Sequence, residues 1–305
     1  MSDPLPDITP APEPFVTEYP FTKAPGADAI LRSADGADFY VHRVILSLVS
    51  PVFETMFQLP QPDAAPAVPV IDVQETSAVL DRALRFFYPG AYPRAATLEE
   101  VQEIIKVLVS KYDVQSVVPV AKQHLEKFCS ARPLAVYAIA FQHRWQDVAT
   151  LAAKESLKLS LRTLNTPAPP ELNGMTAIAY HDLLHYHYLC GTAAQRTAYS
   201  LLWLDPPRAM VTSPNCVCHS RNHAYTFLNN ARYTVPEWFN TYLTSMAGVL
   251  TITPGAILRE NYNFYVALGQ AKCVHCTIYP EFITFVSNEW PAKLAEEMDK
   301  IELKF

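Results

Sequence analysis

The feature that most constrains the fold of this chain is a change of hydrophobic period early in the sequence. A short apolar run over residues 28–33 is followed by the turn signal Asp35-Gly36 and by an alternating pattern over 37–42. From residue 44 to residue 57 the apolar residues recur at helical spacing instead. Because the two periods belong to different structures, the pattern predicts a β-hairpin that leads directly into helix.

Ser50-Pro51 interrupts this helical pattern. Proline has no backbone N–H and clashes with the preceding turn, so it either kinks one helix or begins a second one. In the second case Ser50 would cap the new helix. The sequence leaves both alternatives open.

Four further elements are expected before residue 131. They are a strand over 70–73 and helices over 77–88, 97–113 and 117–129. The third of these has the clearest start, because Thr97 and Glu100 form a capping box ahead of the apolar repeat. A three-stranded sheet is too small to cover these helices, so they must also pack on one another.

The hairpin and the helices after it resemble the core motif of BTB (POZ) domains, D-G-x-x-F-x-x-H-R-x-x-L-x-x-x-S-P-x-F-x-x-M-F. The matching residues are Asp35, Gly36, Phe39, His42, Arg43, Leu46, Ser50, Phe53, Met56 and Phe57. The resemblance implies an α+β domain over 26–131, with a small three-stranded sheet edged by helical hairpins. It also implies a buried structural role for His42, and dimers formed with a second copy or with another BTB protein.

Residues 132–305 are expected to form an all-α C-terminal domain. Helical spacing recurs over 133–143, 146–161, 176–204, 236–250, 256–272 and 280–304. The stretches AVYAIAFQHRWQDVATLAAKESL and YHDLLHYHYLC are similar to a helical region that follows the BTB domain in a group of fungal proteins. That resemblance implies an architecture and no particular reaction.

Proline and glycine contents exclude one large class of function. The chain has 26 prolines and only 8 glycines, and the glycines are widely separated. Cradles for phosphates or dinucleotides need clustered glycines, so no such site is expected. Residues 1–25 are rich in proline and lack apolar periodicity, which predicts a disordered tail.

Charge and hydropathy restrict the partners and the compartment. The net charge is −6 at pH 7, without a run of Lys or Arg, so direct nucleic-acid binding is not expected. No apolar stretch is long enough to span a bilayer, and residues 1–14 lack the features of a secretory signal. We therefore expect an intracellular protein, in the cytoplasm or the nucleus, with no membrane partner.

Four of the 6 cysteines form two close pairs, which predicts a structural zinc site in the C-terminal domain. The expected ligands are Cys216, Cys218, Cys273 and Cys276, with His219, His223 and His275 as substitutes. Tetrahedral zinc takes four ligands, often as two close pairs from separate segments. Buried thiols that pack as small hydrophobes, or a regulated disulfide, are the alternatives.

The segment His181-Asp182-Leu183-Leu184-His185 has the histidine spacing of zinc-protease helices. Asp182 is shorter than the glutamate base of that motif, and no third ligand occurs at a useful spacing. An aromatic packing face is therefore favoured. A metal-dependent hydrolase on the helical domain is the remote alternative.

Many BTB proteins are substrate adaptors of cullin-type ubiquitin ligases, and in those a φ-x-E segment after the first helical pair contacts the cullin. Here Gln58–Asp63 has a hydrophobic residue, Leu59, but no glutamate two positions later. The sequence therefore favours a non-enzymatic scaffold or adaptor that dimerises through its BTB domain. A cullin adaptor is the alternative.

Overall fold

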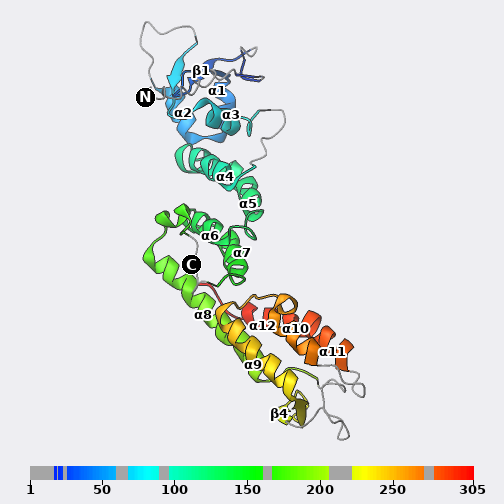
Figure 1. Cartoon of the computed structure of the whole chain (residues 1–305). Helices are drawn as coiled ribbons and strands as arrows, with labels where there is room; N and C mark the ends of the chain where they lie inside the picture. The colour runs from blue at the N-terminus through cyan, green and yellow to red at the C-terminus, as the bar shows by residue number, and fades with distance from the viewer. Residues whose placement is uncertain are drawn as a thin grey trace, which may run out of the picture. The chain divides into compact units, whose positions relative to one another are not determined.

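The computed structural model divides into two compact units, Met1–Leu125 and Glu126–Phe305. The residues it describes are 17–18, 20–22, 26–59, 68–88, 96–160, 167–205, 222–270 and 278–305. Figure 1 shows the sheet in the first unit and the long helices in the second.

A three-stranded sheet begins the first unit. Its strands are β1 (Ala29–Arg32), β2 (Asp38–Val41) and β3 (Val70–Asp72), in the order β2-β1-β3. β1 pairs with β2 antiparallel and with β3 parallel. The turn between β1 and β2 needs a left-handed residue, and Gly36 supplies it with φ of 87°. The predicted hairpin and the predicted third strand are confirmed.

Two helices follow the hairpin, α1 (Arg43–Val49) and α2 (Pro51–Gln58). Ser50 lies between them in extended conformation and accepts a hydrogen bond from the N–H of Phe53 at 3.1 Å. Pro51 is the first residue of α2, where its missing N–H costs nothing. Of the two alternatives left open by the sequence, the structure has the second helix.

The remaining helices of the first unit are α3 (Ser77–Leu84), α4 (Leu98–Ile104), a π-helix (Ile105–Lys111), a 3-10 turn (Gln115–Val117) and α5 (Val118–Glu126). Thr97 and Glu100 form the expected capping box. The single helix predicted over 97–113 is wrong in one respect, because its second half is a π-helix. There the N–H of Tyr112 donates to the carbonyl of Val107 at 3.0 Å.

The core of the first unit extends into the segment expected to be a tail. Phe21 is fully buried, and its ring lies 5.6 Å from that of Phe39 and 5.1 Å from that of Tyr88. The boundary of the tail at residue 25 is therefore wrong for residues 20–22. A single aromatic residue among prolines carries no periodic signal, so the sequence pattern missed it.

The second unit is mostly helical, as expected. Its α-helices are α6 (Pro133–Gln142), α7 (Gln146–Ser156), α8 (Ala177–Tyr199), α9 (Glu237–Ile252), α10 (Tyr262–Gln270), α11 (Ile278–Thr284) and α12 (Trp290–Asp299). Short 3-10 helices lie at Pro170–Gly174 and Leu258–Glu260, and a π-helix at Phe285–Glu289 joins α11 to α12. The helix expected over 256–272 begins later, at Tyr262, after a 3-10 turn.

A β-hairpin in the second unit was not expected. It consists of β4 (Asn222–Thr226) and β5 (Arg232–Pro236), paired antiparallel. The strands are short and much of β5 is exposed, so their alternation is weak. Asn230, with φ of 57°, takes the left-handed turn position that glycine usually fills. The Asn229-Asn230 pair is the signal that could have found this hairpin.

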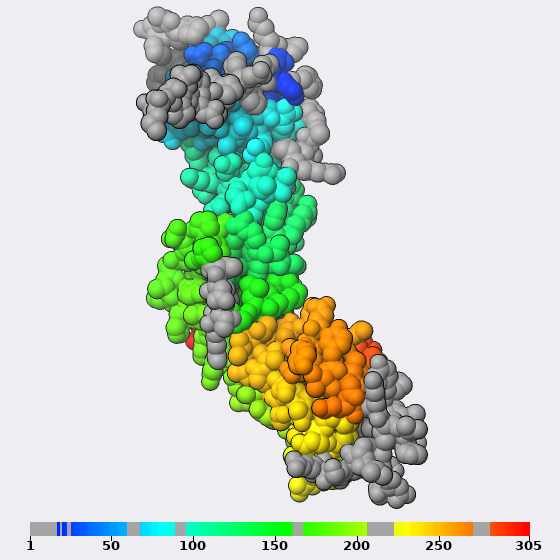
Figure 2. All heavy atoms as spheres, viewed as in Figure 1, coloured from blue at the N-terminus to red at the C-terminus, as the bar shows by residue number. Residues whose placement is uncertain are grey.

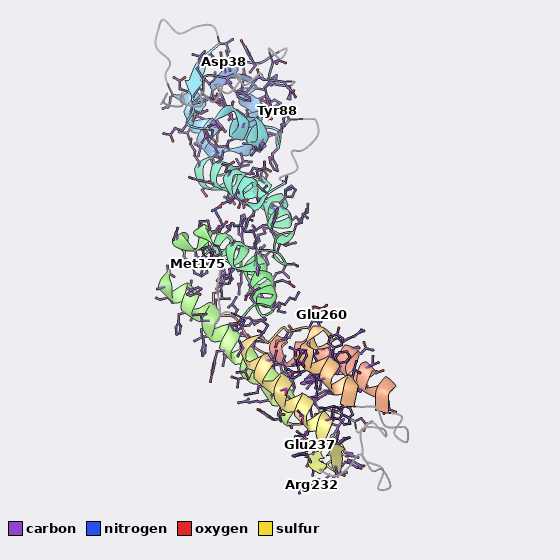
Figure 3. All side chains as sticks on the ribbon, in the orientation of Figure 1. Asp38, Tyr88, Met175, Arg232, Glu237 and Glu260 are labelled. Carbon is purple, nitrogen blue, oxygen red and sulfur yellow. The ribbon has the colours of Figure 1, made fainter. Side chains whose placement is uncertain are left out.

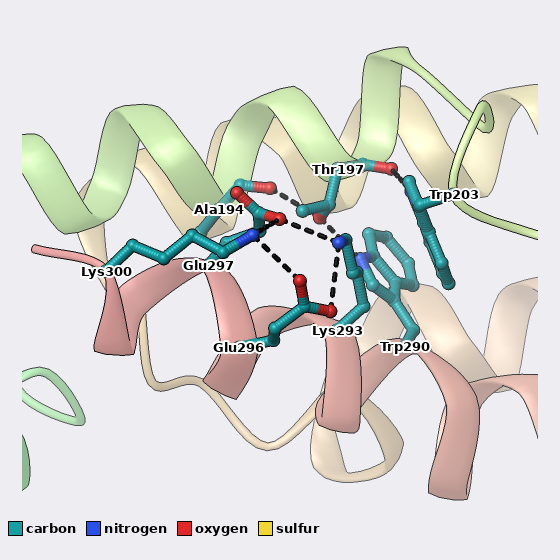
Figure 4. Close-up of polar contacts among 8 residues, drawn as sticks. All are labelled: Ala194, Thr197, Trp203, Trp290, Lys293, Glu296, Glu297 and Lys300. Atoms are coloured by element: carbon teal, nitrogen blue, oxygen red, sulfur yellow. Dashed lines mark hydrogen bonds and ion pairs between the residues drawn. The ribbon is translucent and has the colours of Figure 1, made fainter.

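The core of the second unit lies between α8, α9 and the C-terminal helices. α8 runs along α9, as Figure 1 shows. Aromatic rings fill the centre of this core; among them are those of Phe239, Tyr242, Phe264, Phe282, Phe285 and Trp290. Buried Thr197 joins α8 to α12, because its Oγ1 accepts a hydrogen bond from Nε1 of Trp290 at 2.7 Å (Figure 4).

Candidate protein-interaction surface

Half of the ten motif residues are buried in the interior of the first unit. The apolar ones that are buried are Phe39, Leu46, Phe53 and Phe57. Phe53 stacks on Tyr112 with ring centroids 4.3 Å apart. Met56 is half-buried. These residues hold the hairpin and the first helical pair together, so they support a surface rather than form one.

Asp35 joins the hairpin turn to the start of α3. Its carboxylate accepts hydrogen bonds from the N–H and the hydroxyl of Ser77, at 2.9 and 2.5 Å. Hydrogen bonds from the hydroxyls of Ser33 and Ser77 lower the pKa of Asp35 to about 2. Each of these bonds is to the charged carboxylate, so the turn is held most firmly when Asp35 is ionised.

His42 and Arg43 tie the start of α1 to the rest of the unit. The N–H of His42 donates to the hydroxyl of Tyr88 at 2.8 Å, and the N–H of Arg43 donates to Oδ1 of Asp28 at 2.7 Å. The guanidinium of Arg43 reaches the carbonyl of Phe57 and lies over its ring. Both motif residues therefore make structural contacts within the described part of this unit.

Three residues that the sequence did not single out complete this framework. Glu75 is buried, and its carboxylate lies 2.5 Å from Nζ of Lys111 and 2.8 Å from the hydroxyl of Tyr112. Burial and the nearby carboxylate raise the pKa of Tyr112 well above its usual value. The partners are far apart in the chain, so no local spacing could have predicted the cluster.

The outer face of α1 is apolar and exposed. Val44 and Leu48 are one helical turn apart, and their exposed fractions are 73% and 85%. Leu46, between them in sequence, is buried on the opposite face. The two residues therefore form an exposed apolar pair on one side of α1, which makes this side a candidate for contact with another protein. We call Val44 and Leu48 the α1 face.

The predicted zinc ligands lie outside the described residues, with the exception of His223. Nε2 of His223 lies 2.7 Å from Oε2 of Glu237. Among the described residues there is no group of three or more His, Cys, Asp or Glu side chains that could hold a metal ion. Cys129 and Cys190, which are not part of the two pairs, are buried and not bonded to each other.

The described segments that follow the two cysteine pairs meet at the start of α9. Asn222, the first residue of β4, pairs with Pro236, which directly precedes α9. In α11 the ring of Phe282 meets that of Trp238 edge to face, with centroids 5.1 Å apart. Both segments are therefore held against the same turn of α9.

His181 and His185 lie on the exposed face of α8. Their rings are stacked with centroids 6.3 Å apart, and the ring of Tyr188 continues the stack 6.4 Å from that of His185. The face formed by His181, His185 and Tyr188 is therefore aromatic but exposed, whereas Tyr186 and His187 of the same segment are buried, as a packing face requires. Within the described part of the chain no third metal-binding side chain joins the two histidines.

The fold and this surface define an α+β interaction domain: a small mixed sheet and helical hairpins that present an apolar helix face. Residues 20–128 match the family model of the BTB/POZ domain, so this part of the chain is a BTB/POZ domain. A mostly helical region follows it, as the sequence resemblance implied. No curated protein sequence matches the chain. No helix among the described residues is long and apolar enough to cross a membrane.

Proposed function

We propose that this protein is a non-enzymatic scaffold or adaptor whose BTB domain binds a second BTB domain through the α1 face. BTB domains are protein–protein interaction modules. The observation that carries the proposal is the exposure of Val44 and Leu48 on one side of α1. A second copy of the chain is the first partner we propose, and another BTB protein is the next.

Burial of the α1 face supplies a driving force for this association. Full burial of a valine or leucine side chain contributes about 1.5–3 kcal/mol. In a symmetric dimer both copies would bury the same two residues, because a two-fold interface uses one patch twice. The four side chains, Val44 and Leu48 of both copies, would form the apolar centre of the interface, and polar contacts would surround it.

Sedimentation velocity of the full chain tests this proposal. A change of Leu48→Asp places a charge in the α1 face and is expected to lower the average mass across a concentration series. Val120→Asp is the matched control, because Val120 is 38% exposed on α5 in the same unit. An unchanged mass distribution for Leu48→Asp would contradict BTB-mediated self-association. An equal fall in average mass for Leu48→Asp and Val120→Asp would show that the effect is not specific to the α1 face.

A cullin adaptor is the second candidate. Leu59, at the end of α2, is 59% exposed, which supports a role as the hydrophobic residue of a φ-x-E contact. Gln61 stands where that contact has glutamate, and it lies outside the described residues. A titration of purified cullin against the chain and its Leu59→Asp variant separates the two functions. Cullin binding that is lost in the Leu59→Asp variant but kept in the Leu48→Asp variant would favour the adaptor role.

We also propose that Cys216, Cys218, Cys273 and Cys276 bind one structural zinc ion, with His219, His223 or His275 able to replace a cysteine. The position of β4 and α11 against the same turn of α9 supports this, because both are chain neighbours of the cysteine pairs. When bound, zinc would cross-link the two segments and so stabilise the second unit.

A further inference from the structure

A second exposed face runs along the length of α8, in the other unit of the chain. Its residues recur at alternating spacings of three and four, the heptad spacing of a coiled-coil seam. They are Ile178, His181, His185, Tyr188, Thr192, Gln195 and Tyr199. We call this set the α8 seam. It is separate from the α1 face and is not used by the proposed BTB association.

The α8 seam lies opposite the face that α8 buries. Leu183, Cys190 and Ala194 point into the core, and Gly191 lets α8 approach the backbone of Thr251 in α9. On the seam side Ile178 is 74% exposed and Tyr188 is 55% exposed. Side chains project from α8 away from α9 in Figure 3, and α8 forms part of the surface in Figure 2.

Three aromatic rings lie nearly parallel to one another along the seam. The rings of His181, His185 and Tyr188 stack one above another along the helix. Parallel rings on an exposed helix face offer flat apolar surface that a partner helix can cover. Leu184 and Leu189 flank the seam and are both exposed, which widens the apolar part of the surface.

The charges beside the seam have a two-fold arrangement. Asp182 and Arg196 occupy the same heptad position, directly after a seam residue, and Leu189 lies midway between them. When two such helices pack antiparallel, equivalent flanking positions face each other across the interface. Asp182 of each copy would then lie beside Arg196 of the other, with the two copies of Leu189 near the axis.

From this self-complementarity we propose that α8 is a second self-association surface, which packs antiparallel against α8 of another copy of the chain. In that register Tyr188 faces Thr192, and His185 faces Gln195 of the second copy. A helix of 23 residues is about 34 Å long, enough for three heptads of contact. Histidine, threonine and glutamine in the seam lower the stability of the pair, so a weak, reversible contact is expected.

Two separate self-association surfaces would allow the chain to form assemblies larger than a dimer. A chain that pairs through its α1 face and again through α8 has two isologous contacts, and two such contacts generate assemblies larger than a dimer. The α8 contact does not depend on the BTB contact. A chain whose α1 face is disrupted should therefore still form α8 dimers.

Charge-swap variants in the Leu48→Asp background isolate this contact. Asp182→Arg places like charges opposite each other at both ends of the interface, and Arg196→Asp does the same with acidic residues. Each variant alone should dimerise at least tenfold more weakly than the Leu48→Asp parent, because attractive pairs become repulsive ones. A mixture of equal amounts of the two variants should form heterodimers again, because every pair is then opposite in charge.

Sedimentation equilibrium measures the association constants, and circular dichroism checks that each variant is folded. Glu260→Arg is the matched charge reversal at an exposed site outside α8. It should leave the association of the Leu48→Asp parent unchanged. Tyr188→Glu is a second variant that should reduce association without touching the charged pair.

Recovery of dimers only in the mixture supports the antiparallel α8 contact. A Leu48→Asp chain that stays monomeric over the whole concentration series would overturn it, and so would a mixture no heavier than its components. These outcomes are distinct from failure of the BTB proposal, in which Leu48→Asp has the same mass distribution as the wild-type chain.

Discussion

The hydroxyl of Ser50 donates a hydrogen bond to the backbone carbonyl of Tyr112, and the two oxygens are 2.6 Å apart. The same hydroxyl caps α2 by accepting from the N–H of Phe53. One buried side chain therefore fixes the start of α2 and attaches it to the end of the π-helix. This contact links the motif sequence to an element more than fifty residues away, and it can be tested directly.

Ser50→Ala should destabilise the first unit by about 1–3 kcal/mol, because it removes the cap and leaves a buried carbonyl unsatisfied. Differential scanning calorimetry of the full chain measures the loss. Thr55→Ala is the control, since the hydroxyl of Thr55 bonds the carbonyl of Pro51 on the exposed side of α2. Equal effects of the two changes would show that the bond to Tyr112 adds nothing.

The hairpin turn should lose stability in acid. The pKa of Asp35 is about 2 in the folded chain against 3.8 for the free side chain, so the folded state favours the carboxylate. Its contribution is present above pH 4 and is lost as the pH falls towards 2. Asp35→Asn should therefore lower the melting temperature at pH 6 and converge with wild type near pH 2. A constant difference over this range would refute the assignment.

Gly191→Ala should destabilise the second unit. A Cβ at Gly191 would lie 2.6 Å from the carbonyl oxygen of Thr251, so α8 and α9 must move apart. Overpacking of this kind costs about 1–3 kcal/mol. All 4 tryptophans are in the second unit, so unfolding in urea followed by tryptophan fluorescence reports on it.

Gly248→Ala is the matched control for this change. Gly248 lies in α9 with nothing within 4 Å of the new Cβ. Alanine is the better helix former by about 0.5–1 kcal/mol, so Gly248→Ala should stabilise the unit slightly. A loss at Gly248 as large as that at Gly191 would mean that helix packing is not the cause.

Removal of zinc should lower the stability of the second unit and leave the BTB domain intact. A chelator is expected to shift the tryptophan-monitored transition to lower temperature, and Cys273→Ser should reproduce the shift. Cys190→Ala is the control for loss of a buried thiol outside the pairs. Metal analysis that finds well under one zinc per chain, with the four thiols of the two pairs open to titration, would contradict the site.

Local sequence determined the elements of the BTB domain. The switch from strand to helix period, the capping box at Thr97 and the cap at Ser50 are short-range signals, and each is present in the structure. The second unit was less predictable. The β4–β5 hairpin has no glycine in its turn, and the helix expected from residue 256 begins only at Tyr262.

The candidate surfaces show that a local sequence pattern does not predict which face of a helix is buried. Val44, Leu46 and Leu48 are all apolar, and the sequence cannot say which of them faces the core. Likewise the spacing of His181 and His185 placed them on one face of a helix, and the sequence assigned that face to packing. In the structure it is exposed, because α9 and α12 cover the opposite side.

The sequence by itself indicated a BTB domain, expected over 26–131 and matched by the family model over 20–128, because the motif residues encode strand, turn and cap through neighbours a few positions away. Only the tertiary structure decided which apolar faces remain uncovered. Burial depends on segments far apart in the chain, as when Phe21 packs on Tyr88 or Gly191 admits the backbone of Thr251. The two proposed contacts, at the α1 face and the α8 seam, follow from what those long-range contacts leave exposed.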